Sequence, residues 1–228
     1  MDFAGKRIFV VGGSGALGSE FVRQLTAQGA EVLATARTQE SAERIPATAS
    51  LRLVLDLENP SSIHAATNYV LQSFEKLDGI VLAAGLVGFG SSAETSADNA
   101  KRLAQVNYLG QIQVATELVP AIQKSDAEGR FVVGISGVVA EKTFPGMLAY
   151  SASKAAFSSA LKSLQLELRR SGILVTDARP GHTETGLAGR AIFGQAPKFA
   201  IGMTAEHAVQ TILNGVISGK PELSSTDF

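Results

Sequence analysis

Short apolar runs alternate with longer segments of helical periodicity, and this alternation constrains the fold more than any other feature of the chain. Each run is apolar at nearly every position, as in strands that are buried on both faces of a parallel sheet. The runs cover residues 7–12, 30–36, 51–56, 79–84, 130–136 and 172–178, and the helical segments cover residues 16–28, 60–74, 97–123, 149–170 and 204–218. The pattern predicts an α/β fold, a doubly wound parallel sheet with right-handed crossovers and helices on both faces.

Length and composition favour a single domain. The 228 residues suit one α/β domain, 45% of them are apolar, and no linker or internal repeat divides residues 1–228. The net charge is −1 and the basic residues are scattered, which argues against nucleic acid as the main partner.

Residue types that bind metals are scarce. The chain has no cysteine, and its three histidines lie far apart in the sequence, so we expect no disulfide and no metal site. No apolar run reaches the length of a signal-peptide core or of a membrane span. These observations predict a cytoplasmic protein without a membrane partner.

A glycine-rich turn, GGSGALG, follows the first predicted strand and opens the first helix. Its glycines let the backbone approach a phosphate group closely, and the N–H groups of the helix N-terminus point at the anion. A purely structural turn would show the same glycines, but the position between a buried strand and an amphipathic helix favours nucleotide binding. The candidate residues are Gly12, Gly13, Ser14, Ala16, Leu17 and Gly18.

The residue after the second strand selects the dinucleotide. A carboxylate there would hold the ribose hydroxyl of NAD, whereas a cation suits the extra phosphate of NADP. The chain has Arg37 at this point and no acid at the tip of the strand. A guanidinium pairs well with phosphate, so the sequence favours NADP, the alternative being an ordinary surface arginine.

Tyr150 and Lys154 lie one helical turn apart at the start of the helix predicted over residues 149–170, so both side chains can point into one cleft. An isolated phenol has a pKa near ~10, too high for an acid–base catalyst at neutral pH. A neighbouring ammonium would lower that pKa by stabilising the phenolate. The pair could be a structural feature of the helix, but its place after a strand ending in GISG favours an acid–base role.

Six motifs in order resemble the short-chain dehydrogenase/reductase superfamily, and the resemblance covers the chain from Lys6 to about Ile217. They are the glycine turn, AAG at 83–85, Asn107 in QVNYLG, Ser136 in GISGVV, YSASK at 150–154 and RPGHTET at 179–185. The resemblance implies a Rossmann-type fold, a nicotinamide cofactor, and hydride transfer between that cofactor and a carbonyl or alcohol.

The resemblance also implies a role for each matching residue. Tyr150 would be the general acid–base, Lys154 would bind the nicotinamide ribose and lower the phenol pKa, and Ser136 would hold the substrate oxygen. Asn107 would kink its helix and anchor a water in a proton relay to Lys154. The cofactor would further contact residues after the third, fourth and sixth strands, namely Asp56, Leu57, Ala84, Gly85, Pro180, Gly181, Thr183 and Thr185.

Several of these residues also have a plain structural interpretation. Asp56 could serve a turn, Asn107 could satisfy backbone groups as a buried amide, and Thr183 and Thr185 could close local loop bonds. Each structural interpretation is credible alone, but together they leave the order of the motifs unexplained.

The chain departs from the family pattern at several positions, of which two bear on the proposed site residues. Ala16 stands where the family usually has glycine, and a methyl group there requires a negative φ. The family serine commonly lies thirteen residues before the tyrosine, which is Gly137 here, whereas Ser136 lies one residue further away. We expect Ser136 to fill the role through one extra residue in the following loop, the alternative being a site without a serine.

The C-terminal third of the chain bears on assembly and on the substrate. Only a short last strand fits around residues 220–224, which weighs against a tetramer, whereas the helices over 97–123 and 149–170 are available for a homodimer. The segment 186–202 has four glycines and one proline and is expected to be a mobile loop or lid over an apolar substrate pocket.

We therefore expect an oxidoreductase that uses NADPH, in preference to NADH, on a small-molecule carbonyl or alcohol. A different class of function is a non-catalytic NADP-binding sensor or regulatory protein, because a fold does not fix a function. A weaker alternative is an epimerase or dehydratase, which would return the cofactor to its starting state.

Overall fold

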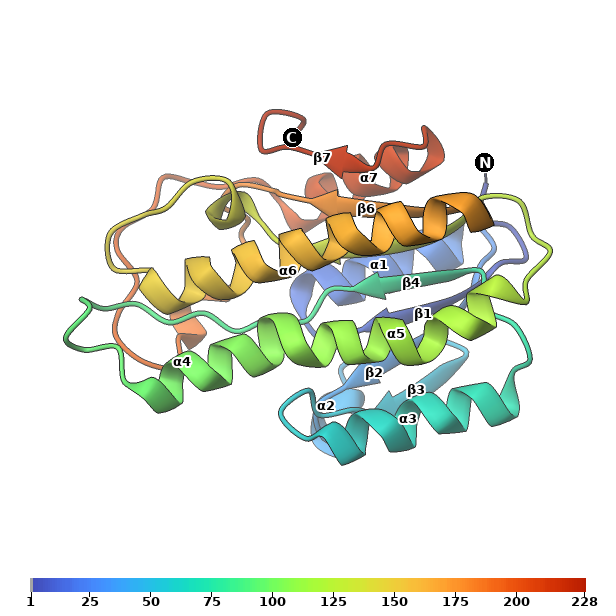
Figure 1. Ribbon diagram of the computed structural model, residues 1–228, viewed down its shortest axis with the longest axis horizontal. Helices are drawn as coiled ribbons and strands as arrows, with labels where there is room; N and C mark the ends of the chain where they lie inside the picture. The colour runs from blue at the N-terminus through green and yellow to red at the C-terminus, as the bar shows by residue number, and fades with distance from the viewer. Residues whose placement is uncertain (1) are drawn as a thin grey trace.

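The computed structural model describes residues 2–228 and contains one sheet of parallel strands (Figure 1). The strand order is β3-β2-β1-β4-β5-β6-β7, and every pair of neighbours runs in the same direction. The strands are β1 (Arg7–Val11), β2 (Glu31–Ala36), β3 (Leu51–Val54), β4 (Gly79–Leu82), β5 (Arg130–Ile135), β6 (Ile173–Ala178) and β7 (Glu222–Leu223). The predicted doubly wound parallel sheet is confirmed, including the short last strand.

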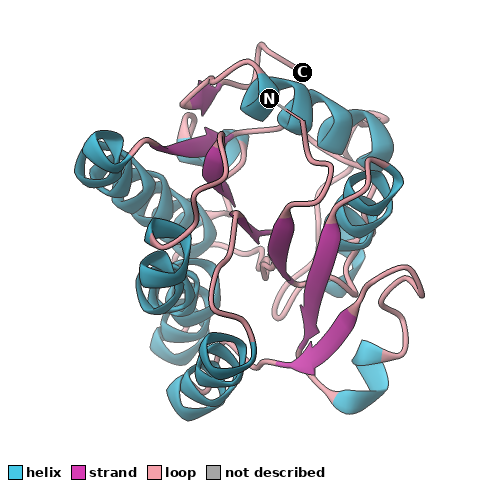
Figure 2. Cartoon of the chain, turned by 90° about the vertical axis from the view of Figure 1, so that its right-hand side faces the viewer, coloured by secondary structure: helices cyan, strands magenta, loops and turns pink. Residues whose placement is uncertain are grey.

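Helices cover both faces of the sheet (Figure 2). One face carries α3, α4, α5 and α6, and the other carries α1, α2 and α7. The helices are α1 (Ala16–Ala27), α2 (Gln39–Ala42), α3 (Pro60–Ser73), α4 (Ala97–Ala104), α5 (Gly110–Gln123), α6 (Leu148–Leu168) and α7 (Ala205–Ile217). Short 3₁₀ turns lie at Val138–Ala140, Arg169–Ser171 and Ala188–Arg190.

Side chains of each strand alternate between two hydrophobic cores. Phe9 of β1 belongs to the core under α3, α5 and α6, whereas Ile8 and Val10 belong to the core under α1 and α7. All three side chains are fully buried. Burial on both faces explains why the strands read as continuous apolar runs in the sequence.

The start of α3 shows how the sequence sets a helix boundary. The Asn59 side chain accepts hydrogen bonds from the backbone N–H groups of Ser61, at 3.0 Å, and Ser62, at 3.4 Å. Pro60 occupies the first helical position, where its missing N–H costs nothing.

The helix predicted over residues 97–123 is interrupted. A π-helical turn at Gln105–Leu109 separates α4 from α5, and Asn107 lies at its centre. The Asn107 side-chain amide forms hydrogen bonds with the backbone of Leu86, outside the helix. The wider hydrogen-bonding pattern of the π-helical turn coincides with this residue. The irregularity coincides with the kink expected at Asn107.

The order of the strands creates a crevice at one edge of the sheet. β1 pairs with β2 on one side and with β4 on the other. The connection after β1 covers one face of the sheet, and the connection after β4 covers the opposite face. The carboxyl ends of β1 and β4 therefore have open space between their connections, which is where ligands bind in sheets of this kind.

No helix within residues 2–228 is long and apolar enough to cross a membrane.

We predict that Gly18→Ala lowers the free energy of unfolding by about 2 kcal/mol, because overpacking a tight contact costs this much. A Cβ at Gly18 would lie 2.0 Å from the carbonyl oxygen of Gly12, so α1 or the turn must shift. Gly15→Ala, whose Cβ would meet the same oxygen at 3.4 Å, is the matched control and should lose less than about 1 kcal/mol. Urea unfolding measures both, and equal losses would contradict the prediction.

Candidate active site

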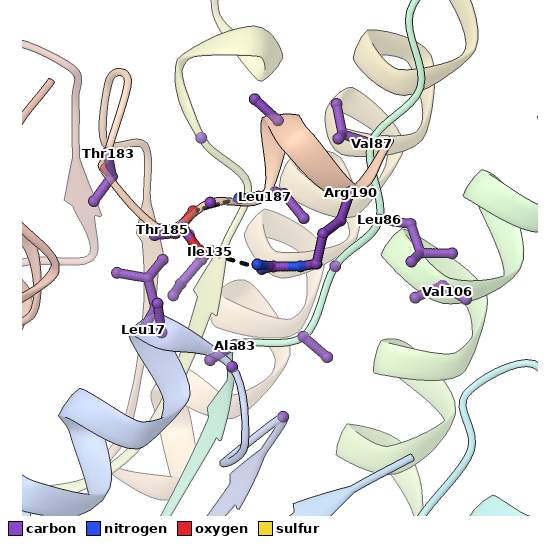
Figure 3. A pocket seen from close by; sticks show the side chains of 18 of the residues that line it. Leu17, Ala83, Leu86, Val87, Val106, Ile135, Thr183, Thr185, Leu187 and Arg190 are labelled. Atoms are coloured by element: carbon purple, nitrogen blue, oxygen red, sulfur yellow. Dashed lines mark hydrogen bonds between the residues drawn. The ribbon is translucent and has the colours of Figure 1, made fainter. Parts of the chain in front are cut away.

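A large cleft of about 1580 Å³ opens at the carboxyl edge of the sheet (Figure 3). The glycine turn and the ends of β2, β4, β5 and β6 form its floor and walls. The segment 180–201 covers one side. Every residue proposed from the sequence as a site residue lines this cleft, except Gly13, Gly18 and Asn107.

The glycine turn is packed so closely that it leaves room only for backbone. Gly12 has φ +83°, and a Cβ there would lie 2.9 Å from Ala84. A Cβ on Gly13 would lie 2.8 Å from the Cβ of Ala34. No residue of 2–228 other than glycine has positive φ, so the negative φ required at Ala16 is present.

The start of α1 is ready for an anion. Gly15 is the N-cap residue, it offers no side chain to the first turn, and that turn carries no acidic residue. Ser14 and Leu17 line the cleft beside it. The turn and the helix N-terminus therefore fit a phosphate group, and they are the part of the cleft where a dinucleotide fits.

Arg37 follows β2, is exposed, and lines the cleft as the sequence suggested. Arg44 lines the same end of the cleft and was not found from the sequence. The capping box of Thr38 and Ser41 begins α2 between the two arginines and turns the chain back toward the cleft. The placing of both arginines along the cleft depends on this four-residue helix, which the hydrophobic pattern does not reveal.

The residues after β3 and β4 lie along the cleft floor. Asp56 accepts a hydrogen bond of 3.0 Å from the Glu58 backbone, so its carboxylate also serves the local turn. The Ala84 carbonyl accepts a hydrogen bond of 2.6 Å from the side chain of Gln111, a fully buried residue that the sequence did not single out. Leu57 and Gly85 also line the cleft.

Asn107, Lys154 and Gly85 come together beneath the cleft. The Asn107 amide exchanges hydrogen bonds with the backbone of Leu86, at 2.8 and 2.9 Å, and donates to Ser153 at 3.0 Å. A Cβ on Gly85 would lie 3.4 Å from Asn107 Oδ1 and 3.6 Å from Lys154 Nζ. The amide therefore holds the chain after β4 beside the Lys154 ammonium.

Lys154 is buried, and its ammonium donates a hydrogen bond of 2.7 Å to the carbonyl of Ile135 at the end of β5. Burial lowers the pKa of Lys154 to about 8, although the charge of Asp177 opposes this change. At pH 7 the ammonium is therefore charged, in surroundings of low polarity.

The phenol of Tyr150 is partly buried at the cleft wall. Burial raises the pKa of Tyr150 to about 12, and this is opposite to the lowering expected from Lys154. The expectation rested on the spacing of the two residues along the helix. In the structure the ammonium is directed to the Ile135 carbonyl, so loss of hydration dominates at the phenol.

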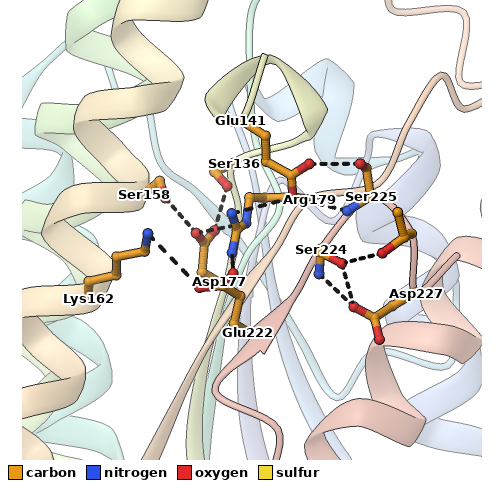
Figure 4. A network of polar contacts seen from close by, with 11 residues as sticks. Ser136, Glu141, Ser158, Lys162, Asp177, Arg179, Glu222, Ser224, Ser225 and Asp227 are labelled. Atoms are coloured by element: carbon orange, nitrogen blue, oxygen red, sulfur yellow. Dashed lines mark hydrogen bonds and ion pairs between the residues drawn. The ribbon is translucent and has the colours of Figure 1, made fainter.

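Ser136 does not offer its hydroxyl to the cleft. The side chain is fully buried, and its hydroxyl donates a hydrogen bond of 2.5 Å to Asp177 on the neighbouring strand β6 (Figure 4). Ser158 of α6 donates to the other oxygen of Asp177 at 2.6 Å. The Ser136 hydroxyl is therefore engaged by Asp177, whereas the sequence predicted that it would be directed at a substrate oxygen.

The next residue, Gly137, explains the difference. It has φ +78°, a conformation that favours glycine, and it turns the chain out of β5 into the 3₁₀ turn at Val138–Ala140. Ser136 faces α6, as expected for a residue two positions after Gly134 on the same strand. Both residues line the cleft, but Gly137 has no side chain and the Ser136 hydroxyl is directed to Asp177.

Arg179 extends the buried polar network that Ser136, Ser158 and Asp177 form. Its guanidinium lies 3.4 Å from Asp177 and 3.3 Å from Glu141, and it also pairs with Glu222 of β7 (Figure 4). Glu141 in turn accepts hydrogen bonds from the backbone and hydroxyl of Ser225. These contacts join the support of the site to the C-terminal segment, and no sequence motif pointed to them.

The segment after β6 forms the far wall of the cleft. Pro180 accepts a hydrogen bond of 2.9 Å from the Val138 backbone, and Thr183 donates 3.1 Å to the Gly181 carbonyl. Thr185 accepts 3.3 Å from the Leu187 backbone. Both threonines therefore make the local loop bonds considered above, while they also line the cleft.

An apolar lobe of the cleft lies beside Tyr150. Val87, Phe89, Val139 and Met147 form a small hydrophobic cluster, against which Tyr150 packs. The segment 186–202 has little regular structure and is attached to the chain after β4 by two hydrogen bonds, Ile192 N–H to Val87 O and Phe89 N–H to Phe193 O. This lobe suits an apolar molecule.

Among residues 2–228, no group of three or more His, Asp or Glu side chains is arranged to hold a metal ion.

Comparison with known proteins identifies relatives over most of the chain. Residues 6–192 match the sequence model of the family described as short chain dehydrogenase. The protein of Escherichia coli K12 named uncharacterized oxidoreductase YbbO is 30% identical over 229 residues, which cover 96% of this chain and 84% of that protein. Mouse dehydrogenase/reductase SDR family member 7B is 25% identical over 97% of this chain and 73% of its own length.

Solved structures show the same fold. A short-chain dehydrogenase from Streptomyces avermitilis superposes with a TM-score of 0.85 at 24% identity and covers 97% of this chain and 88% of its own. A short chain dehydrogenase from Burkholderia cenocepacia, solved in complex with NADP, has a TM-score of 0.85 at 22% identity over 98% of this chain and 89% of its own.

We predict a pH-dependent difference in stability between the wild type and Lys154→Met. Because burial lowers the pKa of Lys154 from 10.5 to about 8, the unfolded chain binds a proton between these pH values that the folded chain does not. The free energy of unfolding of the wild type should therefore rise relative to the variant between pH 8 and 10.5, by up to about 3 kcal/mol.

Urea unfolding at several pH values measures this difference. Lys101→Met, at a largely exposed position, is the control and should give a difference that does not change with pH. A flat difference for Lys154→Met would show that the ammonium is not destabilised by burial.

Proposed function

The chain belongs to the short-chain dehydrogenase/reductase family and is an NAD(P)-dependent oxidoreductase, and we propose that it reduces an apolar carbonyl compound with NADPH, or oxidises the corresponding alcohol. Tyr150 is the proposed general acid–base. The observation that carries the proposal is the Tyr150 phenol at the wall of an apolar lobe, one helical turn from the buried ammonium of Lys154. Family membership favours catalysis over the NADP-binding sensor.

The cleft would hold the cofactor along its full length. The glycine turn, with Ser14, Ala16 and Leu17, would bind the diphosphate; Asp56 and Leu57 would contact the adenine, and Ala84 and Gly85 the ribose. Pro180, Gly181, Thr183 and Thr185 would hold the carboxamide and the near phosphate. When bound, the nicotinamide supplies or accepts the hydride.

Tyr150 and Lys154 would manage the proton. With a pKa of about 12 the phenol is protonated at neutral pH, so it can donate to a carbonyl oxygen that gains charge. The charged Lys154 ammonium would stabilise the phenolate that remains. Asn107 would contribute by holding the chain after β4, and through it the space beside Lys154, in place.

We assign Ser136 a supporting role in place of a substrate contact. Its hydroxyl is held by Asp177, and Gly137 occupies the edge of the cleft. Tyr150 would then be the main hydroxyl that meets the substrate oxygen, which departs from the arrangement that the family resemblance implies.

Arg37 and Arg44 support a preference for NADP over NAD. Both guanidinium groups line the end of the cleft beyond β2, where the adenosine ribose of a dinucleotide is expected. A 2′-phosphate there would gain charge-assisted hydrogen bonds that a 2′-hydroxyl does not offer.

Reduction of carbonyl compounds, followed as loss of the NADPH absorbance, tests the proposal. We expect turnover on apolar aldehydes, ketones or diketones, and a fall of at least about a hundredfold in kcat for Tyr150→Phe. Tyr69→Phe, on the exposed side of α3, is the control and should keep full activity. Replacing NADPH by NADH in the same assay measures the cofactor preference.

Ser136→Ala separates the two roles of the serine in this assay. A supporting role predicts a loss of stability with most of kcat retained, whereas a hundredfold loss of kcat in a stable variant would restore Ser136 to the substrate. Activity that survives in Tyr150→Phe would overturn the acid–base assignment.

We also propose a homodimer that forms through α4, α5 and α6, which lie side by side on one face of the molecule (Figure 1). Leu148 and Leu166 of α6 are 61% and 69% exposed, and Leu109, in the π-helical turn between α4 and α5, is 49% exposed. Burying such side chains against a second copy would stabilise the pair. Sedimentation velocity should show a dimer that Leu166→Glu weakens and that Tyr69→Glu, on α3, leaves intact; a monomeric wild type would exclude the dimer.

A further inference from the structure

Arg190 is a cation that reaches into the cleft from the segment 186–202. It ends the 3₁₀ turn at Ala188–Arg190, and its guanidinium donates a hydrogen bond of 3.2 Å to the carbonyl of Thr185. Figure 3 shows the guanidinium in the middle of the cleft, between Thr185 on one side and Leu86 on the other, above Ala83. An arginine that served only for solubility would gain more from extending into water.

The guanidinium has no acidic partner inside the protein. Within residues 2–228, no carboxylate lies within 4.0 Å of Arg190, whereas Arg102 and Arg179 of the same region pair with Glu58 and with Glu141. A guanidinium offers donors in a planar fork that fits phosphate oxygens. Arg190 therefore faces the cleft with its charge available to an anion.

The backbone turn at Gly186 allows the Arg190 side chain to fold back over the cleft. Gly186 has φ +66°, and a Cβ on it would lie 3.0 Å from Arg190 Nη1. The two backbone hydrogen bonds of Ile192 and Phe193 with the segment after β4 fix the chain immediately after Arg190. The backbone on both sides thus places the Arg190 side chain at the cleft, where the guanidinium is exposed to solvent and contacts the Thr185 carbonyl.

The opposite wall lacks a cation of its own. The glycine turn and the first two turns of α1, residues 12–22, contain no lysine or arginine, and the next one, Arg23, pairs with Glu20 at 2.9 Å. A diphosphate bound there would meet backbone N–H groups and the helix dipole alone. Its two negative charges would lack a counter-ion unless one comes from the facing wall.

We propose that Arg190 binds the diphosphate of the dinucleotide from the loop side, so that the bound cofactor fastens the segment 186–202 over the cleft. The inference rests on the proposed function, because it needs a dinucleotide in the cleft. The apolar lobe beside Tyr150 suits an uncharged molecule and gives a cation no partner. The 2′-phosphate is assigned to Arg37 and Arg44, which lie at the end of the cleft beyond β2. The diphosphate is the anionic group of the dinucleotide that remains for Arg190, whose guanidinium lies in the cleft beside Thr185.

Binding of nucleotide fragments to the full chain tests this assignment. NADPH binding is followed by its fluorescence, and ADP-ribose and adenosine 2′-monophosphate are titrated as competitors. ADP-ribose has the diphosphate without a 2′-phosphate, and adenosine 2′-monophosphate has the 2′-phosphate without the diphosphate. Arg190→Gln should weaken NADPH and ADP-ribose by about tenfold and leave adenosine 2′-monophosphate unchanged.

Two matched variants complete the comparison. Arg37→Gln should weaken NADPH and adenosine 2′-monophosphate and leave ADP-ribose unchanged. Lys198→Gln removes a cation of the same segment that does not line the cleft, and it should bind all three ligands as the wild type does. Arg190 is exposed and makes one hydrogen bond, so its replacement should not impair folding.

Limited trypsin digestion tests whether the cofactor fastens the segment. NADPH should protect the bond after Lys198 in the wild type, and at equal occupancy it should not protect that bond in Arg190→Gln. Equal protection in both proteins would overturn the fastening.

The outcomes separate the two levels of the proposal. A wild type that does not bind NADPH overturns the proposed function itself. A wild type that binds NADPH and an Arg190→Gln variant that binds it equally well overturn only the role of Arg190. A selective loss of adenosine 2′-monophosphate binding would place Arg190 at the 2′-phosphate and overturn its assignment to the diphosphate.

Discussion

The parallel hydrogen bonding of the seven strands is the constraint on which the rest of the structure depends. Parallel neighbours need a crossover between them, so a helix must return the chain after each strand and the carboxyl ends of all strands meet at one edge. The glycine turn, Arg37, Asp56, Gly85, Gly137 and the segment after Ala178 all leave the sheet at this edge. The cleft is therefore a consequence of strand direction. Its two halves meet between β1 and its neighbour β4, where the order of the strands reverses.

Buried polar groups hold the ends of β5 and β6 in position beneath the cleft. Water cannot solvate these groups, so each must find a partner in the protein, and that requirement determines the direction of their side chains. Lys154 finds the Ile135 carbonyl, Ser136 and Ser158 find Asp177, and the charge of Arg179 is shared among three carboxylates. The network reaches from the floor of the site to β7, so the C-terminal segment contributes to a site it does not touch.

The two walls of the cleft differ in chemistry, and the difference supports a division of tasks. The wall built on α1 offers backbone N–H groups and no cation, whereas the wall built from residues 180–201 offers threonine hydroxyls, Arg190 and apolar side chains. The first wall is held rigidly by glycine packing, and the second has little regular structure. An anionic ligand between them would meet the dipole of α1 on one side and the positive charge of Arg190 on the other.

The sequence by itself determined the features that depend on local pattern. These are the glycine turn, the cap of α3, the short last strand, the placing of Tyr150 and Lys154 one helical turn apart, and the limits of the predicted strands and helices to within about two residues. The short helix α2 and the π-helical turn that divides the helix predicted over 97–123 were not predicted. Hydrophobic periodicity and the steric demands of glycine and proline act over a few residues, so they are legible in the chain. Only the tertiary structure decided that Ser136 faces Asp177, that burial raises the pKa of Tyr150, that Gln111 supports Ala84, and that Arg190 points into the cleft. Each of these depends on a partner or on burial contributed by a distant segment, and no local pattern records which segments the fold will bring together.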